Sequence, residues 1–456
     1  MVLRACARRP GGAVTQLDAP RAVSEIARRL DQAGHDTWAV GGAVRDALLG
    51  LAGGDWDLAT SARPDDVRRL FRRTVPIGVE HGTVGVFGTD GVLYEVTTFR
   101  RDVETGGRHA VVEFAHTIDE DLARRDFTFN AIAWQPIHDE VRDPFHGLAD
   151  LRAASLRTVG VPAERFAEDY LRVLRGLRFA GHFVLTPEPA TWHALKNAVP
   201  HLGALSAERI REELLKVLNR TPHASVALDL YERSGALAQL YPELQQLAAL
   251  SAGDTGALWR RTLACVDALP PSRPLLRLAA LLHGIGMPAA ASRDLRGGWR
   301  FTGHEVFGAR KARELMERLK SSNADTEYVA TIVAKQSDLF PPDAPDAGVR
   351  RWLLHVPPRL VRDLFRLRIA LWRAQPVARG DSDLVGRWRH AHRVLATNPP
   401  LDIGDLAIDG SDLKALGLAP GPQFGDILRE LLDCVIDDPS LNERTKLLAM
   451  VRETST

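Results

Sequence analysis

Cysteine is scarce in this chain of 456 residues, which carries only Cys6, Cys265 and Cys434. Their wide separation indicates neither a disulfide framework nor a zinc-binding cluster, so we expect reduced thiols. Long apolar runs are also lacking, because none approaches the roughly 20 residues that span a bilayer. The N-terminal segment lacks the apolar core of a signal peptide. These absences favour a cytoplasmic protein with no membrane contact.

An excess of charge of either sign is missing as well, because 59 lysines and arginines stand against 58 aspartates and glutamates. The formal net charge of +1 excludes a strongly basic nucleic-acid binder, so any RNA contact must come from local patches. Internal repeats and low-complexity tracts are not apparent. The length allows about two to four domains.

What the sequence does contain is a pair of aspartates, Asp55 and Asp57, shortly after a glycine turn at Gly41 and Gly42. Side chains alternate along a strand, so an extended Asp-x-Asp segment turns both carboxylates to one face, where they can share Mg²⁺. Two such metals can activate a hydroxyl and stabilise a leaving pyrophosphate. The glycines would let backbone N–H groups approach a triphosphate. A lone Asp-x-Asp is also typical of a solvated turn.

Glu95 supplies a third carboxylate, within a β-rich run over residues 92–99 that we expect beside the Asp55 strand. Burying an unpaired charge is costly, and a metal held by the two aspartates would give Glu95 a partner. An outward-facing position on the strand explains this residue equally well.

Residues 165–178 combine four arginines with two acids. On one helix, Asp169 and Arg172 would be neighbours on a single face, with Arg175 and Arg178 continuing the stripe. Cytosine and adenine both present an amino donor beside a ring-nitrogen acceptor. A carboxylate beside a guanidinium would therefore accept CTP and ATP and reject UTP and GTP. An ordinary salt-bridged surface helix is the alternative.

The segment 124–133 starts with Arg-Arg-Asp and continues into an apolar run. Arg125, Asp126 and Asn130 could contact a ribose and a triphosphate, as could Arg45 and Asp46 after the glycine turn. A charged helix start, with an acid in the first turn, explains the same residues.

These motifs, in this order, resemble the head and neck of the class II tRNA nucleotidyltransferases, the CCA-adding enzymes of the polymerase-β-like superfamily. The likeness runs through residues 41–62, 77–84, 124–133, 168–179 and 206–214 and weakens toward the C-terminus. It implies an α+β head, a small mixed sheet with helices, followed by an all-α neck, body and tail. It also implies template-independent addition of CCA to tRNA 3′ ends from CTP and ATP, with release of pyrophosphate.

Under this resemblance the singled-out residues take definite roles. Asp55, Asp57 and Glu95 would be catalytic, with the two aspartates holding Mg²⁺. Asp169 and Arg172 would select the base, and the tail would contact the tRNA elbow while the acceptor end is extended. The nucleotide-binding set would be Gly41, Gly42, Arg45, Asp46, Arg125, Asp126, Asn130, Asp169, Arg172, Arg175 and Arg178.

The polar, glycine-bearing segment between Phe99 and Glu113 predicts a mobile loop. In the family, a loop at this place is needed for the switch from C to A addition, and enzymes that add only CC are shortened there. The full length favours a complete CCA-adding enzyme and leaves open an A-adding enzyme that works with a separate CC-adding one. Poly(A) synthesis is disfavoured, because residues 81–84 lack the Gly-Arg-Arg-Phe-like segment usual in such polymerases.

We predict five segments: a poorly ordered leader over 1–20, the nucleotidyltransferase head over 21–153, a nucleotide-selecting neck over 154–220, a helical body over 221–355 and a tRNA-binding helical tail over 356–456. Around His283 and His304 the body resembles an HD phosphohydrolase domain that has lost its metal ligands. Gly284 replaces the name-giving aspartate, and Arg261 and Gln336 stand at two other ligand positions. A hydrolase is therefore disfavoured, and the intact acids and arginines of the head argue against a non-catalytic RNA-binding protein.

Overall fold

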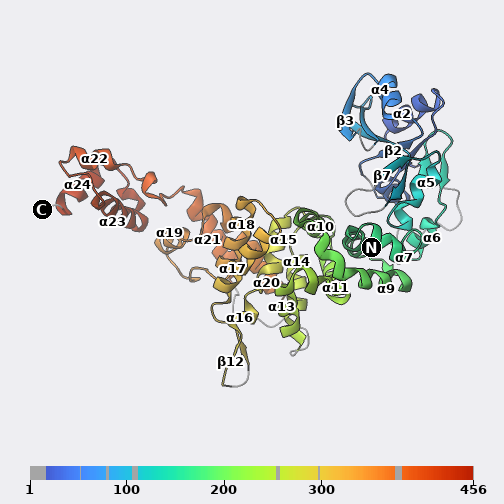
Figure 1. Ribbon diagram of the computed structural model, residues 1–456. Helices are drawn as coiled ribbons and strands as arrows, with labels where there is room; N and C mark the ends of the chain where they lie inside the picture. Colours follow the sequence, from blue (N-terminus) through green and yellow to red (C-terminus); the bar gives the residue numbers. More distant parts are fainter. Residues whose placement is uncertain are drawn as a thin grey trace. The chain divides into compact units, whose positions relative to one another are not determined.

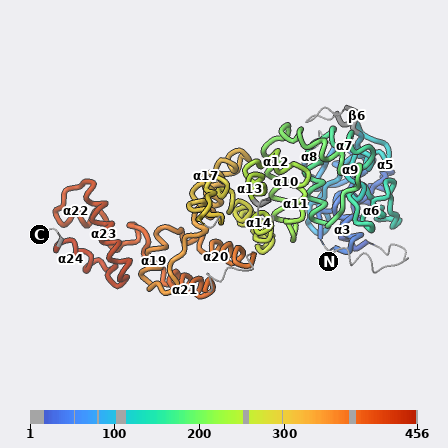
Figure 2. Tube along the Cα trace, turned by 90° about the horizontal axis from the view of Figure 1, so that it is seen from below, coloured from blue at the N-terminus to red at the C-terminus, as the bar shows by residue number. Residues whose placement is uncertain are grey.

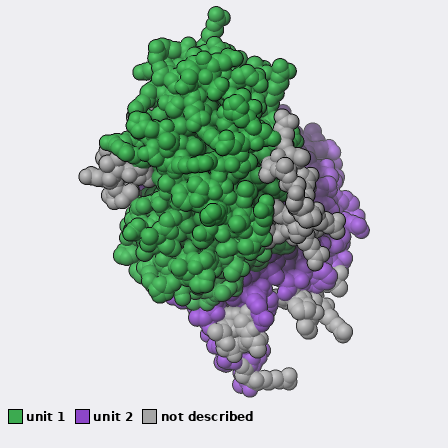
Figure 3. Space-filling view, turned by 90° about the vertical axis from the view of Figure 1, so that its right-hand side faces the viewer, with its two compact units in different colours: residues 1–245 green, residues 246–456 purple. Residues whose placement is uncertain are grey.

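The computed structural model describes residues 17–51, 53–78, 82–104, 111–252, 257–295, 298–374 and 383–454. The chain forms two compact units, residues 1–245 and 246–456, which are coloured separately in Figure 3. Most of the predicted leader lies outside the described residues, and Leu17 near its end is buried. The finer division into head, neck, body and tail stays a prediction.

Unit 1 begins with a mixed seven-stranded sheet (Figure 1). Its strands are in the order β3-β4-β5-β2-β1-β8-β9. Strands β2 and β5 run parallel, and the other neighbouring pairs are antiparallel. The strands are β1 (Thr37–Val40), β2 (Asp57–Thr60), β3 (Thr74–Gly78), β4 (Thr83–Phe87), β5 (Leu93–Thr98), β8 (Ala133–Gln135) and β9 (Glu140–Arg142).

Two helices pack on this sheet: α2 (Arg21–Asp31) contacts β1 and β2, and α4 (Pro64–Leu70) contacts β4 and β5. Apolar residues of α2 recur every three or four positions, so one face of the helix is buried. In β5, buried Tyr94 and Val96 alternate with Glu95 and Thr97, as expected for a strand covered on one face only. Glu95 and Thr97 line a large cavity instead.

A core of buried apolar residues joins the sheet to the short helix α5 (Ile118–Ala123), with Trp38, Phe99 and Leu122 among its members. Thr117 caps α5 by accepting a hydrogen bond from the N–H of Glu120. The other short elements here are α3 (Gly42–Leu48), η2 (Thr128–Asn130) and α6 (Gly147–Arg152).

The segment between Phe99 and Glu113 is not simply a loop where the structure describes it. Strand β6 (Arg100–Glu104) pairs antiparallel with β7 (Val111–Phe114), and residues 105–110 lie outside the described part. Arg101 and Glu113 form an ion pair of 2.7 Å across this ribbon. The loop prediction overlooked the β-branched residues that flank the glycines and favour strands.

The rest of unit 1 is helical apart from the short parallel pair β10 (Ser155–Leu156) and β11 (Thr186–Pro187). Helix α8 packs against α10 and α11, and α7 packs against α9; the path can be followed in Figure 2. The elements are α7 (Pro162–Glu168), α8 (Leu171–Phe183), α9 (Pro189–Ala198), η3 (Val199–Ala204), α10 (Ala207–Arg220), α11 (Ala224–Ser234), α12 (Ala236–Leu240) and α13 (Pro242–Ala252), which reaches into unit 2.

Unit 2 is helical, with α15, α17, α18 and α20 packed together, and it carries the short antiparallel pair β12 (Ser292–Arg293) and β13 (Trp299–Arg300). The helices are α14 (Ala257–Asp267), α15 (Pro274–Leu282), α16 (Met287–Ala290), α17 (His304–Arg318), α18 (Asn323–Lys335), α19 (Asp346–Leu353), α20 (Pro358–Arg373), α21 (Leu384–Ala396), η4 (Ile403–Asp405), α22 (Gly410–Ala415), α23 (Gln423–Asp437), η5 (Pro439–Leu441) and α24 (Arg444–Thr454).

Residues 406–451 have an apolar cluster of their own, built on α22, α23 and α24. Helix α23 also contacts α19, where Arg350 donates to the carbonyl oxygen of Ile436. Among the described helices, none has both the length and the apolarity needed to cross a membrane. The predicted fold class, an α+β head followed by a predominantly helical remainder, is confirmed.

Candidate active site

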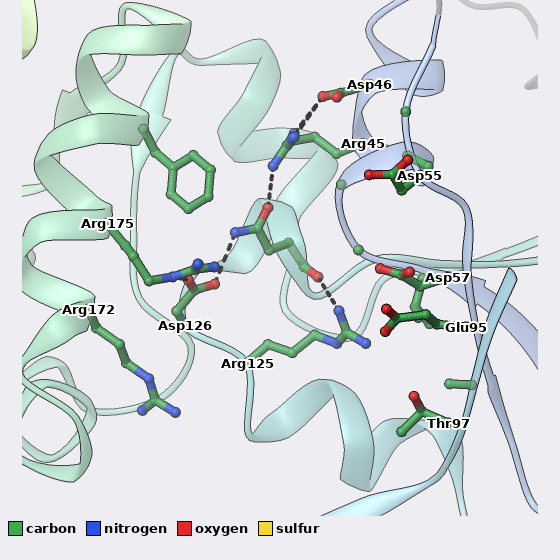
Figure 4. Close-up of a pocket in the computed structure, with 18 of the residues that line it drawn as sticks. Arg45, Asp46, Asp55, Asp57, Glu95, Thr97, Arg125, Asp126, Arg172 and Arg175 are labelled. Carbon is green, nitrogen blue, oxygen red and sulfur yellow. Dashed lines mark hydrogen bonds and ion pairs between the residues drawn. The ribbon is translucent and has the colours of Figure 1, made fainter. Parts of the chain in front are cut away.

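A cavity of about 1000 Å³ in unit 1 is lined by β1, β2 and β5 of the sheet and by helices α8 and α10. Its size is at the upper end of small-molecule sites, roughly 300–1,000 Å³. Nine arginine or lysine residues and seven carboxylate residues line it. All fourteen residues predicted for the site lie in this lining, and Figure 4 labels several of them. The structure thus brings the predicted set together, while the role of each residue stays a prediction.

Three carboxylates occupy the sheet side of the cavity (Figure 4). Asp57 begins β2, and Glu95 lies on the adjacent β5, each one residue before the paired Leu58 and Val96. The prediction that these two segments lie side by side is confirmed. Asp55, however, precedes the strand and is exposed, because the partner strand β1 ends opposite Asp57.

Asp55, Asp57 and Glu95 form an acidic edge of the cavity, where negative charge accumulates. Burial, together with the neighbouring carboxylates of Glu95 and Asp55, raises the pKa of Asp57 to about 6 against the opposing effect of Arg125. A divalent cation would neutralise this charge, and oxygen ligands suit Mg²⁺. No group of three or more ligand residues is gathered at one point in the described part of the chain. That arrangement still fits Mg²⁺, which is usually held by one or two carboxylates together with water and substrate phosphates.

The glycine turn brings the backbone close to these side chains. Gly41 has a φ of 80°, a conformation that L side chains rarely adopt. A Cβ placed there would stand 3.4 Å from Nη1 of Arg125 and 3.8 Å from Oδ2 of Asp57. Glycine therefore leaves the space between the cationic and acidic sides of the cavity open.

A chain of polar contacts crosses the cavity wall from Asp46 to Arg175 (Figure 4). Arg45 donates to Asp46 at 2.8 Å and to Oδ1 of Asn130 at 2.6 Å. Asn130 in turn donates to Oδ1 of Asp126 at 2.9 Å, and Arg175 donates to Oδ2 of the same carboxylate at 2.7 Å. Polar networks satisfied in this way fix side-chain orientations.

The burial of this chain decides what its members can do. Arg45 is only 7 % exposed, and burial lowers its pKa. Its guanidinium is used to orient Asn130 and Asp46, which limits direct contact with a triphosphate. Burial alone would raise the pKa of Asp126, but Arg175, followed by Asn130, holds it below its usual range.

Asp121 is a lining residue that the sequence interpretation missed. Its carboxylate is 2 % exposed and pairs with Arg124 at 3.2 Å and with Arg125 at 3.1 Å. Burial would raise its pKa, but Arg125 and Arg124 outweigh this and lower it. Arg125 also donates to the carbonyl oxygen of Asn130. Asp121 therefore holds Arg125 beside the acidic edge.

The predicted helix over 165–178 is wrong at Asp169. Helix α7 ends at Glu168 and α8 begins at Leu171, so Asp169 has an extended backbone between them. Its carboxylate accepts the N–H of Leu171, a local bond by which aspartate competes with helix formation. Asp169 and Arg172 line the same cavity, but Asp169 is paired with Arg209 and Arg172 is paired with Glu168.

Arg178 reaches the cavity from an otherwise buried position on α8. Its Nε lies 2.7 Å from Oε2 of Glu213 on α10, and the two side chains are 8 % and 1 % exposed. Lys216 donates to the second oxygen of Glu213 at 3.0 Å. The Arg178–Glu213 contact joins α8 and α10. The basic residues of these two helices form the cationic wall of the cavity: Arg172, Arg175, Arg178, Lys216 and Arg220.

Other lining residues were not predicted either. Thr97 could have been found from its spacing of two from Glu95 on the same strand. Lys216 and Arg220 stand four residues apart on α10, which indicates a shared face but no particular cavity. Thr83 and Arg124 lie within the motif-like segments 77–84 and 124–133, whereas Arg100, Asp121 and His182 carry no sequence signal that we recognise.

The HD-like region of unit 2 packs its remaining histidines against backbone groups. His283 is buried, and its Nδ1 lies 2.7 Å from the carbonyl oxygen of Ala280. Burial, with smaller contributions from His304 and Arg261, lowers the pKa of His283 to about 4. Gln336 donates to the carbonyl oxygen of His283. A Cβ on Gly284 would lie 3.2 Å from a methyl carbon of Leu247, so the place of an aspartate is filled.

Comparison with known families gives three matches along the chain. A model described as the poly A polymerase head domain matches residues 37–157, a probable RNA and SrmB binding site of polymerase A matches 185–247, and the HD domain matches 244–366. The head match contains all the predicted site residues up to Asn130.

Curated relatives and a solved structure extend the similarity over nearly the whole chain. The CCA-adding enzyme of Geobacillus stearothermophilus is 32 % identical over 432 residues, which are 94 % of this chain and 95 % of the relative. That of Lactiplantibacillus plantarum is 33 % identical over 458 residues, covering 96 % and 98 %. A crystal structure of the Bacillus stearothermophilus CCA-adding enzyme in complex with CTP has a TM-score of 0.73 at 29 % identity, covering 95 % and 97 %. The chain therefore belongs to the family of CCA-adding enzymes, the class II tRNA nucleotidyltransferases that its motifs resemble.

Proposed function

We propose that the protein adds C, C and A to the 3′ ends of tRNA from CTP and ATP, without a nucleic-acid template, and releases pyrophosphate. The observation that carries this proposal is the cavity of unit 1. On one side of it, carboxylates are suited to a metal that binds a triphosphate. On the other side, several arginines and the carboxylate of Asp169 are suited to the edge of a base. Relatives that share most of the chain are named CCA-adding enzymes.

Nucleotidyltransferases of this family generally use divalent metals. In our proposal Asp55 and Asp57 hold Mg²⁺, which when bound helps to activate the tRNA 3′-hydroxyl and stabilises the leaving pyrophosphate. Glu95 is the third acid at this edge, and its charge acts on Asp57. The raised pKa of Asp57 supports a cation here, because an ionised carboxylate in this place needs a compensating charge.

The sugar and phosphates would be held by the cationic side of the cavity. Arg125, fixed by Asp121, faces the acidic edge across Gly41 and can contact phosphate oxygens. Asp126 and Asn130 are oriented by Arg175 and Arg45, so their remaining lone pairs and protons can meet a ribose hydroxyl. The backbone N–H groups at Gly41 and Gly42 can approach the same triphosphate.

Base selection would fall on Asp169 and Arg172. A carboxylate accepts a hydrogen bond from the amino group of cytosine or adenine, and a guanidinium donates to the adjacent ring nitrogen. Uracil and guanine present a carbonyl toward the carboxylate and leave it unsatisfied, which costs binding energy. One protein surface can thereby serve both CTP and ATP. The proposed location is the cytoplasm, and the proposed RNA contacts are the acceptor end and, through residues 356–456, the elbow of tRNA.

The test uses purified protein, Mg²⁺, labelled CTP or ATP, and three tRNA transcripts that end before CCA, after C and after CC. Growth of all three to CCA is the expected result. Extension of the CC-ending transcript alone, by one A, would instead identify an A-adding enzyme that works beside a separate CC-adding one. Long A tails on unrelated RNA, or no incorporation at all, would overturn the proposal.

A further inference from the structure

Asp169, the acidic member of the proposed base-selecting pair, is held by two donors from the protein. Its Oδ1 accepts the N–H of Leu171 at 3.0 Å, and its Oδ2 accepts Nη2 of Arg209 at 2.7 Å. The first donor is the backbone at the start of α8, and the second is a side chain in the first turn of α10. Because each oxygen has one partner, the plane of the carboxylate is fixed, and each oxygen keeps a lone pair for a ligand.

Arg209 itself does not line the cavity, whereas Asp169 does. The two residues are 40 positions apart in the sequence, so their ion pair is a tertiary contact between the α7–α8 junction and α10. Arg209 therefore acts on a nucleotide through Asp169 and not by touching it.

Arg172, the basic member of the pair, is fixed independently. Its guanidinium donates to the carbonyl oxygen of Arg165 at 2.9 Å, to that of Arg124 at 3.1 Å and to the carboxylate of Glu168. The two members of the pair thus have separate anchors and do not satisfy each other. Their spacing is set by the scaffold, as a surface that reads a base edge requires.

Removing Arg209 would leave the carboxylate of Asp169 with one hydrogen bond from the protein. An ionised carboxylate in a cavity with nine arginines and lysines would turn toward the nearest of them. Arg175 is within electrostatic reach, because the charge of Asp169 acts on it. A carboxylate drawn to that arginine would no longer discriminate an amino group from a carbonyl.

We infer that Arg209 is a specificity-determining positioning residue, which holds Asp169 in the orientation that admits cytosine and adenine and excludes uracil and guanine. This inference rests on the proposed function. It assigns the discrimination to three residues, two that read the base and one that keeps the acidic reader away from the arginines of the wall.

The experiment compares kcat/KM for CTP and UTP on the transcript that ends before CCA, and for ATP and GTP on the transcript that ends after CC. The variants are Arg209→Ala, Arg209→Lys and a control, Arg233→Ala, which removes a more exposed Arg–Asp pair away from the cavity. Arg209→Ala should lower the CTP-to-UTP preference by about tenfold, equivalent to about 1.4 kcal/mol. Arg209→Lys keeps a cation and should retain part of the preference, and Arg233→Ala should retain all of it.

A double-mutant comparison separates positioning from a general structural effect. In an Asp169→Ala background, Arg209→Ala should not change the CTP-to-UTP preference further, because the residue on which it acts is gone. The inference would be overturned if Arg209→Ala left the CTP-to-UTP preference unchanged, or if it lowered kcat/KM equally for all four nucleotides. CCA addition by the wild type would still support the proposed function in either case. If Arg209→Ala does not fold, an unaltered preference in Arg209→Lys overturns the inference in its place. A wild type that adds no C or A would refute the proposed function itself.

Discussion

The buried ion pair between Arg178 and Glu213 gives the sharpest prediction about how the cavity wall is held together. Glu213→Gln keeps the size and shape of the side chain and removes its charge. Arg178 would then remain in a largely buried place, 8 % exposed, without its counter-charge. Removing one partner of a buried pair costs about 3–5 kcal/mol, and the amide oxygen of glutamine can still accept one hydrogen bond worth about 1 kcal/mol.

The free energy of unfolding of unit 1 should therefore fall by about 2–4 kcal/mol. For a unit of this size that corresponds to a fall in Tm of about 5–12 °C. Thermal denaturation measures the total effect, and hydrogen exchange over residues 171–183 and 207–220 shows whether it is localised at α8 and α10. The control is Glu212→Gln, an exposed position on the same helix, which should change stability by less than about 0.5 kcal/mol.

The dependence on pH has a definite sign. Burial alone would raise the pKa of Glu213, but Arg178, with help from Lys216, lowers it. A carboxylate with a lowered pKa stabilises the fold above the pKa of the unfolded chain, about 4.3, and loses this contribution as the pH falls through the folded value. The difference between wild type and Glu213→Gln should be complete at neutral pH and should shrink below about pH 4. A variant within about 1 kcal/mol of the wild type at neutral pH, or a difference that grows on acidification, would refute this reasoning.

Three other perturbations follow from the same site, and a fourth concerns the HD-like region of unit 2. Asp57→Asn should lower incorporation by at least about a thousandfold and leave tRNA binding intact in a filter-binding assay. Asp121→Asn should lower stability by about 2 kcal/mol, and it should also raise KM for CTP, because Arg125 loses its anchor. Gly41→Ala should destabilise by about 1 kcal/mol, because of its positive φ, and should lower kcat in steady-state assays. His283→Ala should leave CCA addition unchanged and should release no more phosphate from phosphate esters than the wild type, since the described residues gather no ligand set for a hydrolase.

The acids of the sheet side and the glycine turn could be predicted because their signals are local. The β-rich run over residues 92–99 was correctly expected beside the strand of Asp57, and Gly41 stands where a positive φ is needed. The position of Asp55 could not be derived in this way, because the end of its strand depends on where the partner strand turns away.

The cationic wall was predictable in composition but not in its pairing. Asp121 stands beside Asp119 and Glu120 in the first turn of α5, where acids are expected for electrostatic reasons, so nothing local distinguishes the buried one. Glu213 and Arg178 are 35 residues apart, and their ion pair exists only because α8 and α10 pack together. Asp169 was wrongly placed on a helix. Its carboxylate accepts the N–H of Leu171, and this local hydrogen bond competes with a helical conformation.

The packing around Gly284 makes the loss of the HD metal centre hard to reverse. Restoring an aspartate there would push its Cβ against Leu247, at 3.2 Å, before any ligand were regained. A further mutation at Arg261 or Gln336 would then be needed, and Gln336 now satisfies the carbonyl oxygen of His283. An aspartate at position 284 would therefore require Leu247 to shift and would by itself supply only one ligand.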